Sequence, residues 1–271
     1  MRTVHTELLE IAFDEGALRT GRRYSCSTGA GCAARLGRSR GRASRKRLAY
    51  DRTVSSRLWS NEVFVQRNPS CRCRCGSRAG ARAAYTLAVL FPERVTNITA
   101  LALAFQPRGL CKIPRFDQAR RFWYQWFLCV DGGMAKVQND PLGFARTQWD
   151  TWSPGGWFDE AEFSQTAKSF LNPDWVAIAS NAYPSRWRDG EAWDSRYDPL
   201  QRRLGDVGTI STPTLMIQGM SDFCDAPSES EGLEAHFTAR YQRVLLDGVG
   251  HFPHREAPVD VTAAILRHLG I

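Results

Sequence analysis

Apolar strand patterns alternate with helix patterns on both sides of a long middle segment, and this alternation limits the fold more than any other feature. Residues 95–105 read VTNITALALAF and residues 212–222 read TPTLMIQGMSD, both rich in the β-branched and apolar residues of buried strands. A helix pattern precedes the first strand at 80–91, and another follows the strand pattern of 241–251 at 257–269. The alternation predicts an α/β architecture with a mostly parallel central sheet.

The middle segment, residues 107–208, has a different composition from the flanking parts. Most of the nine tryptophans lie in it, among helical patterns such as FDQARRFWYQWFLCV and DEAEFSQTAKSFL. We therefore expect an N-terminal half of the α/β core at 1–106, a helical cap at 107–208 and a C-terminal half of the core at 209–271. The cap would form an apolar pocket over the rim of the sheet, where a small organic substrate could be enclosed.

The positive charge of the chain is confined to one region. The net charge is +8, but residues 21–82 hold 16 Lys or Arg against two acids, so the remainder is acidic. A basic run such as GRSRGRASRKRLAYDR could bind phosphates, yet such runs are more often solvated or disordered. On this composition, disorder is one of the expected states of residues 21–79. Three cysteines there, Cys71, Cys73 and Cys75, lack C-x-x-C spacing and a second ligand pair, so they do not predict a zinc site.

The location of the protein follows from what the sequence lacks. Its apolar runs stay short of the roughly 18 residues that a membrane helix needs. Residues 3–13 alternate polar and apolar side chains, which is typical of an edge strand and unlike a signal peptide. Cysteines are few outside the basic region, as in intracellular proteins. We therefore expect a cytoplasmic protein.

Two candidate catalytic side chains follow two consecutive strand patterns. Asp222 comes directly after one strand and His251 after the next, each in a turn that contains glycine. Because the carboxyl ends of parallel strands line one crevice, both side chains should emerge at the same rim. A carboxylate that orients an imidazole is a common way to activate a nucleophile or a water molecule. Separately, Asp222 could be a turn residue or helix cap and His251 a packing residue; their order on consecutive strands favours catalysis.

Three segments resemble a known family. Residues 80–95 (GARAAYTLAVLFPERV), 212–227 (TPTLMIQGMSDFCDAP) and 245–258 (LLDGVGHFPHREAP) are similar to the α/β hydrolases with a helical cap, in the branch of epoxide hydrolases and haloalkane dehalogenases. The resemblance covers residues 80–271. It implies the α/β-hydrolase fold, with Asp222 orienting His251 and His251 activating water. It implies no cofactor and no metal.

The nucleophile of that family is missing from its expected position. The family carries Gly-His-Asp-Trp-Gly before the first of these segments, with Asp as the nucleophile, and this chain has Gly76, Ser77, Arg78 and Ala79 before Gly80. Arg78 cannot attack a substrate because a guanidinium is cationic at every accessible pH. The sequence therefore predicts an incomplete N-terminal part of the core and impaired turnover.

A frameshift would explain this loss, and we state it as a hypothesis. Ser77-Arg78 written TCA CGA contains CAC GA, which in another frame begins His-Asp. Likewise, Ser27-Thr28-Gly29 written TCC ACG GG contains CAC GG, the start of the family's His-Gly oxyanion turn. The interval between the two positions is also too short for the strand and helix crossings expected there. Residues 21–79 thus look frame-shifted and shortened, and the genomic sequence of this region tests the hypothesis.

The helical segment adds one candidate. Tyr183, in SNAYPSRW, resembles the cap tyrosine that protonates the epoxide oxygen, although Pro184 stands where the family often has Arg. Tyr124 is a weaker second candidate, and packing in the lid is the alternative role for both. The halide-binding Trp of dehalogenases is replaced by Ala79.

These observations together predict a hydrolase acting on a small apolar substrate, epoxide hydrolase-like and impaired by Arg78. The alternative is a non-catalytic relative that binds a ligand or protein under the cap. We expect neither nucleic acid nor membrane as partner. The sequence does not choose between epoxide, haloalkane and ester chemistry, and it does not give the oligomeric state.

Overall fold

The computed structural model describes residues 79–106, 113–172, 175–177, 179, 183–187, 195–205 and 208–270, and the backbone of strands β1 to β8 before them. Arg78, the expected nucleophile position, lies outside the described residues, as does most of 21–79. None of the described helices is long and apolar enough to cross a membrane.

The central sheet has seven strands in the order β11-β10-β9-β8-β7-β4-β3. Its first four strands are parallel, which confirms the predicted α/β fold with a parallel sheet. On the other side of β8 the N-terminal strands join antiparallel, so the sheet is parallel only in its C-terminal half. The strands are β3 (Glu15–Ala17), β4 (Arg23–Cys26), β7 (Val63–Arg67), β8 (Cys73–Ser77), β9 (Asn97–Leu101), β10 (Thr214–Gly219) and β11 (Tyr241–Leu246).

Two short hairpins lie outside this sheet. β1 (Arg2–His5) pairs antiparallel with β2 (Glu10–Phe13), and β5 (Leu36–Arg38) pairs with β6 (Leu48–Tyr50). The prediction of a single edge strand over 3–13 is therefore wrong, because the two halves of this stretch satisfy each other's backbone groups.

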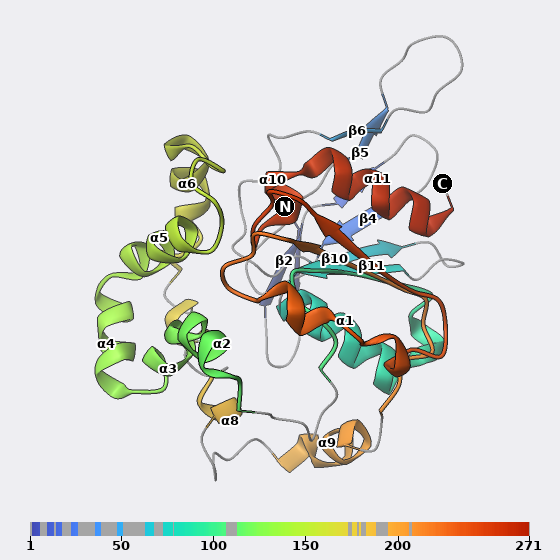
Figure 1. The fold of residues 1–271 in the computed structure, drawn as a ribbon, viewed down its shortest axis with the longest axis horizontal. Coiled ribbons are helices and arrows are strands. Elements are labelled where there is room, and N and C mark those ends of the chain that lie inside the picture. Colours follow the sequence, from blue (N-terminus) through green and yellow to red (C-terminus); the bar gives the residue numbers. More distant parts are fainter. Residues whose placement is uncertain are drawn as a thin grey trace.

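Helices cover both faces of the parallel half, and Figure 1 shows α1 (Ala79–Leu90) and α11 (Pro258–Leu269) on opposite sides of β10 and β11. The side chains of β9 accordingly pack into two different clusters, one on each face of the sheet. Ile98 and Ala100 pack in one cluster with the small residues of α1, whereas Leu101 packs with α11. Residues 98–101 of β9 are all buried, as expected of a strand covered on both faces, and Thr99 is the one polar side chain among them.

A helical segment connects β9 to β10, and Figure 1 shows its first helices gathered beside the sheet. Aromatic side chains supply most of its core. Asp140 and Asp159 cap two of its helices by accepting bonds from the backbone N–H groups of Gly143 and Glu162. The helices are α2 (Phe116–Arg121), α3 (Trp123–Phe127), α4 (Asp131–Asn139), α5 (Pro141–Thr151), α6 (Glu160–Ala167), α8 (Pro184–Trp187) and α9 (Asp198–Gly205).

The aromatic core of the helical segment extends into the C-terminal part of the chain through Phe252. Its ring stacks on Trp157, with centroids 4.7 Å apart and planes inclined by 20°. Trp149, fully buried, packs against both rings at centroid distances of 5.8 Å and 4.6 Å. The segment and the loop after β11 thus share one apolar core.

We expect Trp149→Ala to lower the free energy of unfolding by about 3–5 kcal/mol, because it opens a cavity in this shared core. Urea denaturation of the full chain measures the change. Val259→Ala, at a position 76% exposed on α11, is the matched control and should change stability by less than about 0.5 kcal/mol. Equal stability of the two variants would contradict a shared core.

Candidate active site

The loops after β10 and β11 touch each other, and this contact places the two predicted catalytic side chains. The backbone N–H of Ser221 donates to the carbonyl of Val249 at 2.9 Å. A Cβ at Gly219 would come within 2.1 Å of that same carbonyl oxygen, so only glycine allows the loops to approach so closely. Asp222 and His251 follow these contacts directly, at the carboxyl ends of neighbouring parallel strands.

The structure brings Asp222 and His251 together. Nδ1 of His251 lies 2.8 Å from Oδ2 of Asp222, and the two residues are 0% and 1% exposed. The other oxygen, Oδ1, accepts from the backbone N–H groups of Cys224 at 2.8 Å and Asp225 at 2.9 Å. A buried carboxylate needs such donors to remain charged. Since Asp222 can only accept when ionised, the proton of this pair belongs on Nδ1, which leaves Nε2 as the basic nitrogen.

A second buried carboxyl holds the turn that carries the imidazole. Glu256 accepts bonds from the backbone N–H groups of Gly250 and Phe252, on either side of His251. The hydroxyl of Ser153 donates to Glu256 at 2.7 Å and accepts from the N–H of His251 at 2.9 Å. The backbone N–H groups of residues 250–252 are therefore each bound by a side chain, which fixes the backbone from which the imidazole projects.

Burial raises the pKa of Glu256 above its usual value of 4.5. The bonds from Gly250, Ser153 and Phe252 act in the opposite direction because they favour the charged form, while the negative charge of Asp222 adds to the rise. Burial is the largest of these effects, so the folded protein ionises this carboxyl less readily than the unfolded chain does.

Helix α2 reaches the other loop of the site. The side-chain amide of Gln118 donates to the carbonyl of Cys224 at 2.8 Å and accepts from the N–H of Ala226 at 3.1 Å. Arg121 donates to the backbone carbonyl of Asp222 at 2.9 Å. The helical segment thus supports the acid loop through α2 and the histidine turn through Ser153.

An open hollow lies beside the pair. Its wall includes Trp152, whose ring meets the imidazole of His251 edge-on at a centroid distance of 5.0 Å. The hollow is lined by Arg120, Arg121, Trp123, Thr151, Trp152 and Phe223. It combines three aromatic side chains with two cationic ones, and neither Asp222 nor His251 is among its lining residues.

The two tyrosines of the helical segment lie next to each other. The rings of Tyr124 and Tyr183 meet edge-on, 5.6 Å apart at an interplanar angle of 88°. The Tyr124 hydroxyl accepts from the side-chain amide of Gln125 at 2.7 Å. Tyr124 also packs on Trp152 at 4.9 Å, so a chain of aromatic contacts links Tyr183 to His251.

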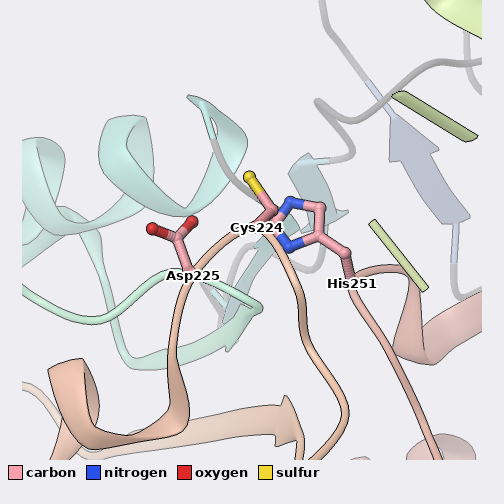
Figure 2. Close-up of side chains that lie close together, drawn as sticks. All are labelled: Cys224, Asp225 and His251. Carbon is pink, nitrogen blue, oxygen red and sulfur yellow. The ribbon is translucent and has the colours of Figure 1, made fainter. Parts of the chain in front are cut away.

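Several residues of the site were missed by sequence reasoning. Ser153, Gln118 and Glu256 carry no motif, and Ser153 and Gln118 act on residues roughly a hundred positions away in the chain. The Glu in HFPHRE, at the end of α10 (Pro253–Glu256), was the only local signal. Cys224 and Asp225 were also passed over, although with His251 they form the group of potential metal ligands found among the described residues (Figure 2).

Comparisons with known proteins agree with this fold. The chain is 33% identical over 214 residues to Epoxide hydrolase A of Mycobacterium tuberculosis, covering 70% of this chain and 66% of that protein. A crystal structure from Klebsiella pneumoniae assigned to the epoxide hydrolases matches with a TM-score of 0.66 and 28% identity, covering 74% of this chain and 67% of that one.

More distant structures extend the match in fold. Epoxide Hydrolase A from Mycobacterium thermoresistibile has a TM-score of 0.56 at 20% identity, with 74% of this chain and 69% of that one covered. No family model matches the sequence. The chain spans about two thirds of the length of the relatives that it matches.

We expect Asp222→Asn to move the proton of His251 from Nδ1 to Nε2. The amide oxygen can still accept from the loop backbone, but the amide NH₂ would donate to Nδ1 and require it to be unprotonated. Nitrogen-15 NMR of the imidazole distinguishes the two tautomers. His236, remote from the pair on η5 (Glu234–His236), serves as internal control, and an unchanged His251 spectrum would contradict the bond.

We expect Glu256→Ala to destabilise the protein by about 2 kcal/mol or more, because it leaves two backbone donors and the Ser153 hydroxyl without their acceptor. Chemical denaturation measures this loss. Glu93→Ala is the control, since the Glu93 side chain is 64% exposed and forms an ion pair with its exposed neighbour Arg94.

The same carboxyl should make stability depend on pH. Because its folded pKa is raised, its contribution is fully present below the ordinary value of 4.5 and is lost as pH rises through the folded pKa. Glu256→Gln cannot ionise and should lack this component. A parent and a variant with identical pH dependence would contradict the raised pKa.

Proposed function

We propose that this chain, which belongs to the epoxide hydrolase-like branch of the α/β-hydrolase superfamily and is a hydrolase by family, carries the acid and base of a covalent hydrolysis reaction on a small apolar substrate. The observation that supports this most is the buried 2.8 Å bond between Asp222 and His251 at the carboxyl ends of β10 and β11. Acid and histidine follow in chain order, as in α/β hydrolases.

The chemistry would proceed in two steps. A carboxylate at position 78, before α1, would attack an epoxide carbon, break the carbon–oxygen bond and form an ester with the substrate. His251 would then take a proton from water through Nε2, and the resulting hydroxide would attack the ester carbonyl. The tetrahedral intermediate would collapse to the carboxylate and the diol, whose released oxygen takes the hydroxyl proton of that intermediate. The proton on the imidazolium would return to the phenolate of the group that protonated the epoxide oxygen, which restores both side chains. Asp222 would stabilise the imidazolium that forms and keep the ring in the correct tautomer.

Tyr183 is our candidate for the proton donor to the opened epoxide oxygen. Its ring packs on Tyr124, which packs on Trp152, and Trp152 in turn contacts the imidazole of His251. In this role the phenol would donate its proton as the carbon–oxygen bond breaks, so that no free alkoxide forms. The helical segment would act as the cap, with the hollow beside Trp152 admitting an apolar substrate.

The chain as written would turn over slowly or not at all, because position 78 holds Arg. A guanidinium has no basic lone pair and cannot form the ester. The acid–base half of the site would remain intact without its nucleophile. We attribute this loss to the frameshift and shortening inferred from residues 21–79, which sequencing of the genomic region tests.

We expect Arg78→Asp to raise epoxide hydrolysis by at least about 100-fold over the parent chain, since loss of a covalent nucleophile costs orders of magnitude. Styrene oxide as substrate and chromatography of the diol measure the change. Arg78→Asn removes the positive charge equally but cannot form the ester, so it is the matched control and should remain as slow as the parent.

Adding His251→Gln to the Arg78→Asp chain should trap the covalent ester, visible as an added substrate mass on the intact protein. Without its base the ester would form but not hydrolyse. Epoxide, haloalkane and ester substrates would identify the preferred chemistry in the same assay. Neither turnover nor a trapped ester in these variants would contradict the proposal, and ligand-induced stabilisation without chemistry would favour a binding protein instead.

A further inference from the structure

The imidazole of His251 also belongs to a second group of side chains, in which two further residues bring metal-binding atoms close to it. A sulfur, a carboxylate oxygen and a ring nitrogen from Cys224, Asp225 and His251 all lie within 4.8 Å of one another, and all three residues are buried. Figure 2 shows the sulfur and the carboxylate on the side of the imidazole away from its Cβ. The proposed hydrolysis uses neither Cys224 nor Asp225.

A single carboxylate organises all three groups. Oδ1 of Asp222 holds the backbone N–H groups of Cys224 and Asp225, and Oδ2 holds Nδ1 of His251. Histidines that bind metals usually donate their other ring N–H to a carboxylate in this way, which fixes the ring and makes the binding nitrogen more basic. A metal ion would bind His251 through Nε2, because Nδ1 is engaged by Asp222.

The cysteine side chain has a neighbour that could support its thiolate. The thiol of Cys224 donates to the Tyr124 hydroxyl at 3.8 Å, and that hydroxyl also accepts from Gln125. Since a hydroxyl both accepts and donates, it can rotate to donate to the sulfur once the thiol proton is lost. Gln118 bonds to the carbonyl of Cys224 and the N–H of Ala226, which fixes the loop on either side of Asp225.

The ligand types select the metal. A thiolate, an imidazole and a carboxylate suit Zn²⁺, whereas Mg²⁺ and Ca²⁺ prefer oxygen ligands alone. In a tetrahedral zinc site the ligand atoms would lie about 3.3–3.6 Å apart, so the three groups, whose ligand atoms lie within 4.8 Å of one another, would have to move closer together to bind one ion. Three protein ligands leave the fourth position for water.

We propose that Cys224, Asp225 and His251 form a three-ligand site for Zn²⁺. On binding, the thiol releases its proton, and the thiolate, one carboxylate oxygen and Nε2 donate to the metal with no change of oxidation state. The site does not depend on the proposed hydrolysis. Zinc binding and the proposed hydrolysis cannot occur at the same time, because a zinc-bound Nε2 cannot accept a proton from water.

The test uses the full chain with Cys71, Cys73 and Cys75 replaced by Ser, because these clustered thiols could bind zinc themselves. Zinc affinity is measured by competition with a chromophoric chelator. Cobalt(II) then serves as a spectroscopic substitute, since a thiolate ligand gives it a ligand-to-metal charge-transfer absorption. We expect one equivalent of metal and a thiolate–cobalt band.

Cys224→Ser should abolish the band, and Asp225→Asn, which keeps the shape of the side chain, should weaken zinc binding at least about 10-fold. Cys129→Ser, a cysteine in the helical segment outside the group, should leave both unchanged. Equal zinc affinity in the Cys224→Ser or Asp225→Asn variants, or cobalt binding without a thiolate band, would overturn the site.

A second measurement keeps Cys224 and its site unchanged, so its result does not depend on whether the site variants fold. Zinc should slow alkylation of Cys224 by iodoacetamide at least about 10-fold, as read from the modified peptide by mass spectrometry, because a metal-bound thiolate is shielded and less nucleophilic. Alkylation of Cys129 should not change. A rate at Cys224 that is the same with and without zinc would overturn the proposal.

Discussion

The bonds of one carboxylate, that of Asp222, connect the parts of this molecule that could do chemistry. One oxygen holds the imidazole of His251 and the other holds two backbone N–H groups of its own loop. Burying a charge is costly unless donors surround it, and here three donors do so. Because the same group fixes both the ring and the loop, neither can move without weakening the other. Any role of this site, catalytic or metal-binding, depends on this shared acceptor.

The helical segment contributes to this arrangement as directly as the sheet does. The sheet brings the two loops together through the close approach at Gly219, which a side chain would prevent. The segment then supports each loop from outside, with Ser153 under the histidine turn and Gln118 beside the acid loop. Its aromatic core includes Phe252, the residue next to His251. The orientation of the imidazole is therefore set by contacts from both parts of the chain, and a change in one part should be felt at the site.

Sequence alone predicted the parts of this structure whose signals are local. The apolar strands at 95–105 and 212–222 were recognisable by composition, and Asp222 and His251 by their position in glycine turns after strands. Two of the antiparallel strands that extend the sheet beyond β8, β4 and β7, were not predicted, since they come from the basic region, whose sequence has no hydrophobic period. Ser153 and Gln118 were missed because their partners lie far away in the chain and polar residues on a helix or in the turn after one have many other uses. The proximity of Tyr124 to Tyr183 likewise appears only once the helices are packed.

The same geometry favours two different uses of His251. A base for hydrolysis needs a ring nitrogen that is basic, oriented and shielded from bulk water, and a zinc ligand needs the same properties. What separates the two is the neighbouring groups: a nucleophile before α1 would direct the imidazole toward water, whereas Cys224 and Asp225 offer two further donors to a cation. In our proposal Arg78 stands in place of that nucleophile, so the base would have none to serve, whereas the sulfur and the carboxylate of Cys224 and Asp225 lie beside it. The proposed loss of the nucleophile would thus remove the first use of the ring but leave the neighbouring donor atoms that the second one requires.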